Sequence, residues 1–243
     1  MAETAYLPGV TIQNTEVLDA PRHSALVRVT HWVHALSFFG LFISGIAILL
    51  AHPRLYWGET GAVGGPSLID LPLPFVLNIP IRGPGRYLHF LSAWVCVLNG
   101  LLYVISGFFT RHFARNLVPA KGEFNWSTIT RILGSHARLK RPGEAEARTY
   151  NVVQRLSYLG VIFVLFPLVI WTGLGMSPAV VSVIPAMATT WGGQQSARTI
   201  HFFVSSLLVV FLVVHIAMVW LAGFKKRMRA MITGRSASRK ETP

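Results

Sequence analysis

The stretch TIHFFVSSLLVVFLVVHIAMVW, residues 199–220, decides the fold, because it is apolar over the length that crosses a bilayer and still carries two histidines. His201 and His215 are fourteen residues apart. Fourteen helical steps of about 100° return to within about 40° of the start, and a rise of about 1.5 Å per residue puts about 21 Å between the rings. The two imidazoles therefore share one helix face at opposite membrane depths. Because an imidazole is costly in hydrocarbon unless something satisfies it, each histidine marks a functional site.

The composition is that of an all-α integral membrane protein. Of the 243 residues, 52% are hydrophobic and 13% are charged, and the mean hydropathy is +0.51. Four stretches are long enough to cross about 30 Å of hydrocarbon, which predicts one domain built as a four-transmembrane-helix bundle. The predicted spans are residues 27–51, 87–110, 152–176 and 199–224. Small residues where helices or a flat cofactor can approach closely are Gly40, Gly45, Gly100, Gly107 and Gly173.

The distribution of positive charge predicts the orientation. A net charge of +13 would suggest a nucleic-acid partner for a soluble protein, but here cations gather before the first span, in residues 111–149 and after the fourth span. By the positive-inside rule, that loop and the tails, residues 1–26 and 225–243, are cytoplasmic. Residues 52–86 and 177–198 then face the periplasm, and we expect the protein in the bacterial inner membrane, without nucleic acid. The polar N-terminal tail lacks a cleavable signal peptide, so the first span is expected to insert as a signal anchor.

Two loops are long enough to have roles of their own. Residues 52–86 contain turn signals throughout, with several aromatic and leucine side chains, so they either pack against a partner or cap the outer end of the bundle. In the cytoplasmic loop, FNWSTITRILGSHARL is typical of an amphipathic helix in the lipid interface, with an apolar face of Ile129, Ile132 and Leu133. The single cysteine, Cys96 in the second span, excludes an intrachain disulfide and a cysteine-ligated cluster.

Membrane depth pairs the histidines of the fourth span with histidines of other spans. Neutral imidazole is a strong ligand for haem iron, and two axial histidines leave no open position, so such an iron carries electrons. His201 and His89, the latter in GRYLH, both lie near the periplasmic ends of their spans. His215 and His31, the latter in RVTHW, both lie toward the cytoplasm. The sequence therefore predicts two stacked haems held by these four histidines.

Other polar residues are candidates for supporting roles. His34 lies about 60° round the helix from His31, so it is an alternative ligand; otherwise it bonds a haem propionate or a quinone, or simply packs. Propionates need cations at each membrane face, although interface arginines also anchor helices. The candidates are Arg28 and Arg111 at the cytoplasmic face, and Arg82, Arg86 and Arg198 at the periplasmic face. The loop and tail histidines, expected to be solvated, are His23, His52, His112 and His136.

Four motifs resemble the bacterial di-haem cytochrome b family, which supplies the membrane subunits of Ni-Fe hydrogenases, formate dehydrogenases and thiosulfate reductases. They are RVTHW, GRYLH, TYNVVQRLSY at the opening of the third span and the His-x13-His spacing of the fourth, and the resemblance covers residues 22–230. It implies two stacked b haems in the bundle. The implied ligands are His31 with His215 on the cytoplasmic side and His89 with His201 on the periplasmic side.

The same resemblance implies partners and a function. A quinone is implied near the cytoplasmic-side haem, at Asn151 and Gln154, which otherwise cap or pack the helix start. The long periplasmic segment with YWGE is most similar to homologues that accompany a molybdopterin oxidoreductase, so we expect a periplasmic molybdopterin or Fe-S subunit. The predicted function is electron transfer between this partner and the quinone pool, in either direction. Two rivals are a stand-alone haem b oxidoreductase of the superoxide or ferric reductase type and a haem-free transporter or adaptor.

Overall fold

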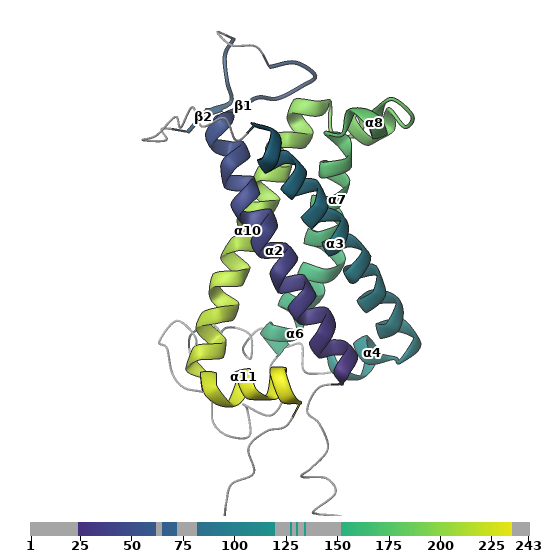
Figure 1. Cartoon of the computed structure of the whole chain (residues 1–243), viewed down its shortest axis with the longest axis vertical. Coiled ribbons are helices and arrows are strands. Elements are labelled where there is room, and N and C mark those ends of the chain that lie inside the picture. The colour runs from purple at the N-terminus through teal and green to yellow at the C-terminus, as the bar shows by residue number, and fades with distance from the viewer. Residues whose placement is uncertain are drawn as a thin grey trace, which may run out of the picture.

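The computed structural model describes residues 24–61, 65–71, 82–119, 127, 130, 134 and 152–234. In this part of the chain, four helical segments are long and apolar enough to cross a membrane, as Figure 1 shows, so the protein is a multi-pass membrane protein. They are α2 (Ala25–Ala51), α3 (Arg82–Phe109), the composite segment Val152–Gly175 and α10 (Gln194–Leu221). The four helical segments overlap the four predicted spans, but α3 and α10 both begin a few residues earlier than expected, and α10 also ends earlier.

The third span is a composite of three helical elements. It runs through α6 (Val152–Gly160), the π-helical turn η1 (Val161–Leu165) and α7 (Phe166–Gly175). The amide of Phe166 bonds the carbonyl of Val161, five residues back, which is the wider repeat of a π-helix. Pro167 follows at once, and a proline inside a helix removes one amide donor and crowds the carbonyl four residues earlier. The π turn accommodates that crowding without breaking the span.

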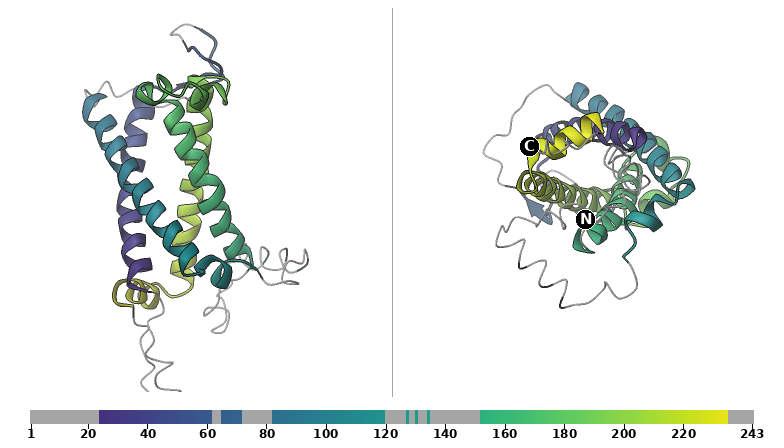
Figure 2. Two further views of the ribbon diagram at one scale, coloured as in Figure 1. Left: turned by 90° about the vertical axis from the view of Figure 1, so that its right-hand side faces the viewer. Right: turned by 90° about the horizontal axis from the view of Figure 1, so that it is seen from below.

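The spans pack as two pairs, which Figure 2 shows from the side and from below: α2 lies along α3, and α7 lies along α10. Few close backbone approaches join α10 to α2 or α3. In the first pair, a side chain at Gly40 would collide with the Ser92 hydroxyl, so glycine permits the close approach of α2 and α3 there. Gly45 and Gly100, by contrast, have open space where a side chain would stand.

The face of α2 that turns inward is lined by small polar residues. Its buried residues are Thr30, Ser37 and Ser44, spaced by seven, which is two helical turns. Each hydroxyl bonds a carbonyl of its own helix, for example Thr30 to Leu26 at 2.8 Å and Ser44 to Gly40 at 2.7 Å. Small polar residues whose hydroxyls bond their own helix can be buried inside a membrane bundle. The apolar residues of the helix can then face lipid.

The end of the bundle where α10 begins is covered by loop residues. Strands β1 (Arg54–Leu55) and β2 (Ile69–Asp70) form a short antiparallel pair, and the helices α8 (Pro178–Val181) and α9 (Ala186–Thr189) lie at the same end in Figure 1. The Arg54–Asp70 ion pair, 3.1 Å, is exposed and contributes about 0–1 kcal/mol. The stretch after β1 is bonded to the start of α10, so for this part of the long loop the capping role is confirmed.

That stretch contacts the start of α10 through its own backbone atoms. The Thr199 hydroxyl donates to the Tyr56 carbonyl at 2.6 Å, and the Gly58 amide donates to the Ser196 hydroxyl at 2.7 Å. The Gly58 carbonyl in turn accepts from the Gln195 amide at 3.0 Å. Gly193, with φ 123°, lies so close to the Gly58 backbone that a side chain there would collide with it. The loop therefore satisfies amides at the start of α10 that the helix itself leaves unpaired.

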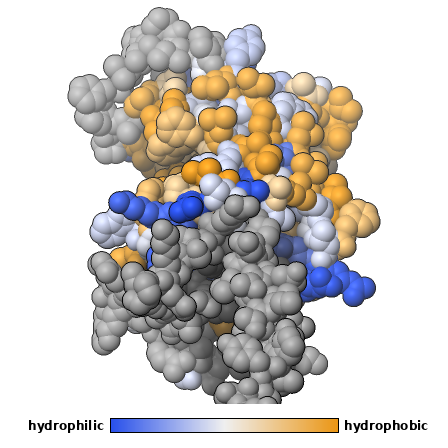
Figure 3. Space-filling model, turned by 60° about the horizontal axis from the view of Figure 1, so that its bottom comes forward, coloured by the Kyte–Doolittle hydropathy of each residue, from blue (hydrophilic) through white to orange (hydrophobic). Residues whose placement is uncertain are grey.

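The opposite end is closed by α11 (Phe224–Thr233), which turns back from α10 after Gly223 and lies across the end of the bundle in Figure 1. The Arg28 guanidinium donates to the Ile232 carbonyl at 3.0 Å, and the Trp32 indole donates to the Met231 carbonyl at 3.1 Å. These bonds dock α11 on the start of α2. Figure 3 shows hydrophilic residues gathered toward this end and apolar residues over the spans.

The structure corrects the boundary expected after the fourth span. The sequence predicts a span that reaches residue 224 and a basic tail from 225, but the chain turns at Gly223, and its next residues form the docked helix α11. Its exposed cations include Lys225, Lys226 and Arg229. Residues 1–23 of the predicted N-terminal tail lie outside the described residues, and residues 24–26 form the cap and start of α2. The apolar face of the predicted amphipathic helix, Ile129, Ile132 and Leu133, also lies outside the described residues.

Candidate haem-binding histidine pairs

Four histidines form two pairs between the helix pairs, and the two rings of each pair face each other. His89, near the start of α3, and His201, near the start of α10, have ring centroids 6.3 Å apart and ring planes 61° apart. His31, near the start of α2, and His215, near the end of α10, have centroids 6.4 Å apart and planes 47° apart. Because α2 and α10 run in opposite directions, one pair lies toward each end of the bundle. These are the two pairs that membrane depth predicts.

The separation within each pair fits two axial ligands of one haem iron. An imidazole nitrogen binds a transition metal at about 2.0 Å and the ring centre lies about 1.1 Å behind it, so two imidazoles on opposite sides of one iron have centroids about 6.2 Å apart. Among the described residues, no group of three or more His, Cys, Asp or Glu side chains could hold a metal ion. Two histidines alone do not close a protein-only site, and a macrocycle supplies the other positions of haem iron.

Hydroxyl groups contact the pair of His89 and His201. The Ser44 oxygen lies 3.0 Å from Nδ1 of His89, and the Thr172 oxygen lies 3.1 Å from Nδ1 of His201. Both hydroxyl residues come from the neighbouring helix of the same pair, α2 for His89 and α7 for His201. Sequence reasoning missed both residues, because a serine or threonine in an apolar span normally bonds its own backbone. Gly173 also approaches the His201 ring, so this imidazole has little room to turn.

The pair of His31 and His215 has a different environment. Nδ1 of His31 is buried, and it has no hydrogen-bond partner in the described part of the chain. The His215 ring stacks on Phe211, with centroids 6.0 Å apart and planes 24° apart. Trp32 presents its edge to His31 at 5.3 Å. Aromatic rings rather than hydroxyls therefore surround these two imidazoles.

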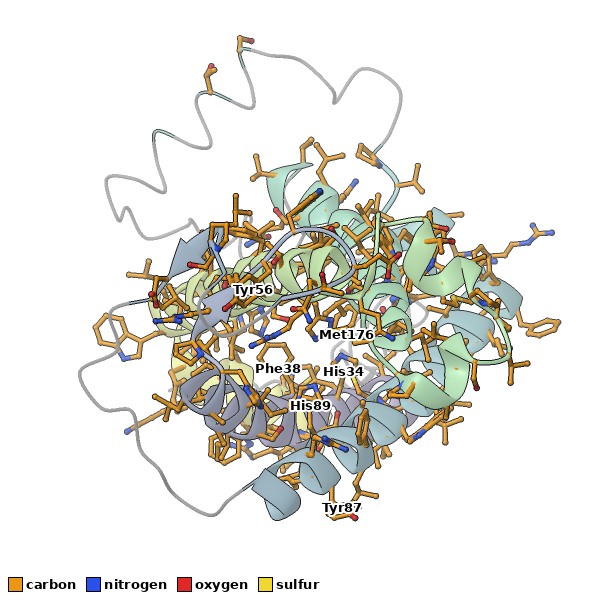
Figure 4. The ribbon with its side chains drawn as sticks, turned by 90° about the horizontal axis from the view of Figure 1, so that it is seen from above. His34, Phe38, Tyr56, Tyr87, His89 and Met176 are labelled. Carbon is orange, nitrogen blue, oxygen red and sulfur yellow. The ribbon has the colours of Figure 1, made fainter. Side chains whose placement is uncertain are left out.

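His34 turns toward α3 rather than α10. Its ring nitrogens lie 3.6 and 3.9 Å from the Cys96 sulfur, and Nδ1 is 3.5 Å from the Asn99 amide, which also donates to the Thr30 carbonyl. Phe166 of the third span packs against the ring at 4.8 Å. In Figure 4, seen along the bundle from above, His34 and His89 lie toward its middle, whereas Tyr87 points away from it. The geometry thus favours His31 as the ligand from α2 and gives Cys96 a packing role.

The arginines predicted to bind haem propionates differ in burial and in hydrogen-bond partners. Arg28 is half-buried; one of its terminal nitrogens docks α11, and its Nε is buried with no partner among the described residues. Arg198 is half-buried and donates to the His52 carbonyl, at the end of the bundle that holds His89 and His201. Arg86 and Arg111 are exposed, and Arg111 adopts a left-handed conformation with φ 53° between α3 and α4 (His112–Asn116). The Arg82 side chain lies outside the described residues.

Of the two polar residues predicted to bind quinone at the start of the third span, the structure describes one. Gln154 is half-buried in α6, at the end of the bundle where α2 begins and α10 ends (Figure 1). That end is also the end of His31 and His215. Asn151 lies outside the described residues.

His112 differs from the solvated side chain that the sequence suggests. It lies in α4, half-buried, with Tyr103 and Phe113 edge-on at 6.1 and 5.9 Å. Burial lowers the pKa of His112 below its usual range, because the charged imidazolium is poorly solvated there. Its described ring contacts are with these two aromatic residues, so we assign it a packing role at this end of the bundle.

Comparison with known proteins identifies the family of the chain. The family model described as prokaryotic cytochrome b561 matches residues 22–234. The chain belongs to this family. Proteins of the family bind haem b, so this cytochrome is a membrane haem b protein of electron transport, and a haem-free transporter no longer fits.

Three similar proteins are named as subunits of larger enzymes. The putative protein-methionine-sulfoxide reductase subunit YedZ1 of Azospira oryzae is 28% identical over 217 residues, 87% of this cytochrome and 96% of the relative. Probable Ni/Fe-hydrogenase B-type cytochrome subunits of Bradyrhizobium diazoefficiens and Cupriavidus necator are 24% and 26% identical, over 80% and 88% of this cytochrome and 75% and 82% of the relatives. No solved structure matches the chain.

Proposed function

We propose that this cytochrome is the di-haem b subunit of a respiratory oxidoreductase, and that it connects a periplasmic catalytic subunit with the quinone pool. The observation that carries the proposal is the presence of two facing histidine pairs, both at a ring separation that suits axial ligands of iron. His89 with His201 would hold one haem b, and His31 with His215 the other. Haem, when bound, supplies one-electron chemistry by cycling between ferric and ferrous iron.

The chain's own residues favour electron transfer over substrate chemistry at these sites. A histidine on each side of the iron leaves no position for a substrate. Both pairs take one member from α10, fourteen residues apart, so the helix rise separates the two sites by about 21 Å along the span. That distance covers most of a hydrocarbon core of about 30 Å. The two sites together are thus arranged to carry charge from one membrane face to the other.

The outer end of the bundle supports the docking of a catalytic partner. Trp57 is 59% exposed although its neighbours Tyr56 and Gly58 are bonded to α10, and Val183, between α8 and α9, is 79% exposed. Large apolar side chains held outward on a fixed surface are typical of protein–protein contacts. This end lies beside His89 and His201. The relatives' names as hydrogenase and reductase subunits support a catalytic partner, which we propose is a molybdopterin or Fe-S protein.

The opposite end supports a quinone site. Gln154 lies at the level of His31 and His215, and the motif that contains it continues to Asn151. An amide side chain can donate to a quinone carbonyl or accept from a quinol hydroxyl. The cations of α11 and of the loop between the second and third spans support a cytoplasmic location for this end and for both termini, in the bacterial inner membrane.

Haem content per chain tests the proposal. The cytochrome is purified in mild detergent, haem is measured as its pyridine complex, and the reduced-minus-oxidised spectrum is titrated against potential. We expect two haems b per chain with two midpoint potentials. One haem per chain contradicts the di-haem proposal, and a spectrum without b-type bands contradicts haem binding altogether. Full quinone-linked activity of the cytochrome alone, with no co-purifying redox subunit, would instead favour the stand-alone oxidoreductase.

A further inference from the structure

We propose that Ser44 and Thr172 are positioning residues that fix the tautomer of His89 and His201 and thereby lower the reduction potential of the haem they hold. The inference rests on the proposed function, because it assumes that these two histidines ligate iron. It concerns one haem site of the two. The hydroxyls touch the imidazoles and not the iron, so they act through the ligands.

The Ser44 hydroxyl donates its proton to a carbonyl of its own helix. Its oxygen lies 2.7 Å from the Gly40 carbonyl and 3.1 Å from the Leu41 carbonyl, both of which can only accept. A hydroxyl has one proton to donate, and that proton is directed at its own helix. Toward Nδ1 of His89, 3.0 Å away, the Ser44 oxygen can therefore only accept. The shared hydrogen must be on Nδ1 of His89.

Thr172 repeats this arrangement on another helix. Its oxygen lies 2.8 Å from the Leu168 carbonyl and 3.1 Å from the Val169 carbonyl, so its proton is also directed at its own helix. Toward Nδ1 of His201, 3.1 Å away, the Thr172 oxygen can therefore only accept, and the Val169 carbonyl lies within reach of the same ring as a second acceptor. Thr172 is 0% exposed and Ser44 is 1% exposed, so water does not compete for either contact. Two unrelated helices thus present the same acceptor to the two members of one pair.

The position of the proton decides what the other nitrogen can do. With hydrogen on Nδ1, the neutral imidazole has its free lone pair on Nε2, the nitrogen left to bind iron. A hydrogen bond from the ring N–H also fixes ring orientation and makes the ligand more basic. A more basic ligand stabilises ferric iron over ferrous iron. The two hydroxyls therefore lower the potential of the haem between His89 and His201.

The effect is specific to one pair. In the described part of the chain, neither His31 nor His215 contacts a hydroxyl, and Nδ1 of His31 is buried without a partner. The His215 ring is stacked on Phe211 instead. Loss of the Ser44 or Thr172 hydroxyl should therefore change one midpoint potential and not the other.

The test replaces the Thr172 hydroxyl by a methyl group. For Thr172→Val in the full-length cytochrome, we expect two haems per chain, an upward shift of one midpoint potential and an unchanged second one. The electron paramagnetic resonance signal of the shifted ferric haem should change as well. Ser44→Ala should shift the same potential in the same direction, and Thr172→Ser, which restores the hydroxyl, should return it to the wild-type value. Ser206→Ala is the matched control, because Ser206 bonds the Phe202 carbonyl at 2.8 Å and sits on α10 without touching a ligand.

Three results would overturn the inference. One is unchanged midpoint potentials in both Thr172→Val and Ser44→Ala with two haems present. Another is an equal shift in Thr172→Val and Thr172→Ser, which would assign the effect to packing. The third is a shift of the same size in the Ser206→Ala control. If Thr172→Val fails to fold, Ser44→Ala decides the matter. A wild-type protein with no haem, or with one, instead refutes the proposed function and is recognised before any variant is made.

Discussion

The imidazole rings of His89 and His201 face each other with centroids 6.3 Å apart, although one belongs to the second span and the other to the fourth. Neither helix packs closely along the other, because α3 lies against α2 and α10 against α7. The two rings approach from separate helix pairs, and the pair of His31 and His215 repeats the arrangement at the other end. The four imidazoles therefore meet in the region between the two helix pairs.

This arrangement predicts which histidines act together. His89→Ala and His201→Ala should each remove the same one of two haem signals, and His31→Ala and His215→Ala should each remove the other, because an iron that loses one axial imidazole loses the low-spin b-type signal. Haem content should fall from two to about one per chain in every single variant. Redox titration of the four variants identifies the signal that is lost. If His89→Ala and His31→Ala removed the same signal, the pairing would be wrong.

His34 is predicted to be dispensable for haem binding. Its ring contacts Cys96, Asn99 and Phe166 and does not face His215. His34→Ala should therefore keep two haems per chain, with a modest loss of thermal stability from the cavity that it leaves. Haem content is measured beside that of His31→Ala, which shares the same helix and should lose one haem. Equal losses in the two variants would show that His34 also ligates or holds iron.

The spans and the histidine pairs are predictable from sequence, because both depend on local rules. Hydropathy fixes the span lengths, and the helical repeat fixes the relative depth of His201 and His215. The start of α10 is less predictable: Gln194, Gln195 and Ser196 are too polar for a span by composition, yet they are helical because the Gly58 backbone satisfies this end. The residues that a loop contacts cannot be predicted from the local sequence.

Two further features depend on tertiary contacts that the sequence does not reveal. The residues after Gly223 have the composition of a basic tail, and they form α11 because Arg28 and Trp32, from the far end of the chain, bond its last turn. In the sequence, Ser44 and Thr172 look like ordinary residues whose hydroxyls bond their own helix. Only the packing of neighbouring helices brings them to His89 and His201. Sequence reasoning finds the paired histidines, but it does not find the hydroxyl residues that contact them.

Docking of α11 should depend on the Trp32 indole. Trp32→Phe removes the donor to the Met231 carbonyl and keeps an aromatic ring. One lost hydrogen bond costs about 1 kcal/mol, so α11 should open about five times more often and trypsin should cut at Lys225 and Lys226 about five times faster. Trp220→Phe, an exposed tryptophan of α10, is the control and should leave the rate unchanged. An unchanged rate in Trp32→Phe would mean that the indole bond does not hold α11.

The contact between the outer loop and α10 should require glycine at 193. Gly193 has φ 123° and ψ 172°, a region open essentially only to glycine, and a side chain there would also meet the Gly58 backbone. Gly193→Ala should destabilise the protein by about 3 kcal/mol or more. Gly223→Ala, which has positive φ but open space around it, should cost about 1–2 kcal/mol. The apparent Tm in detergent compares the two variants, and equal losses would contradict the close approach.

Gln154 should affect reaction with quinol and not haem binding. In Gln154→Ala, loss of one hydrogen bond to the quinone, worth about 1 kcal/mol, should slow haem reduction by a quinol analogue about fivefold. Two haems per chain and both midpoint potentials should be retained. Gln194→Ala, at the opposite end of the bundle, is the matched control and should react at the wild-type rate. A normal rate in Gln154→Ala would place the quinone elsewhere.

Helix α10 contributes one histidine to each pair, and it follows the three other described spans in the chain. Neither pair exists until that span has been translated and inserted. A chain with only the first three spans contains one member of each pair, His31 and His89, on helices that pack against each other. If these pairs hold the haems, cofactor loading must wait for insertion of α10, and a truncation before residue 201 should yield a colourless membrane protein.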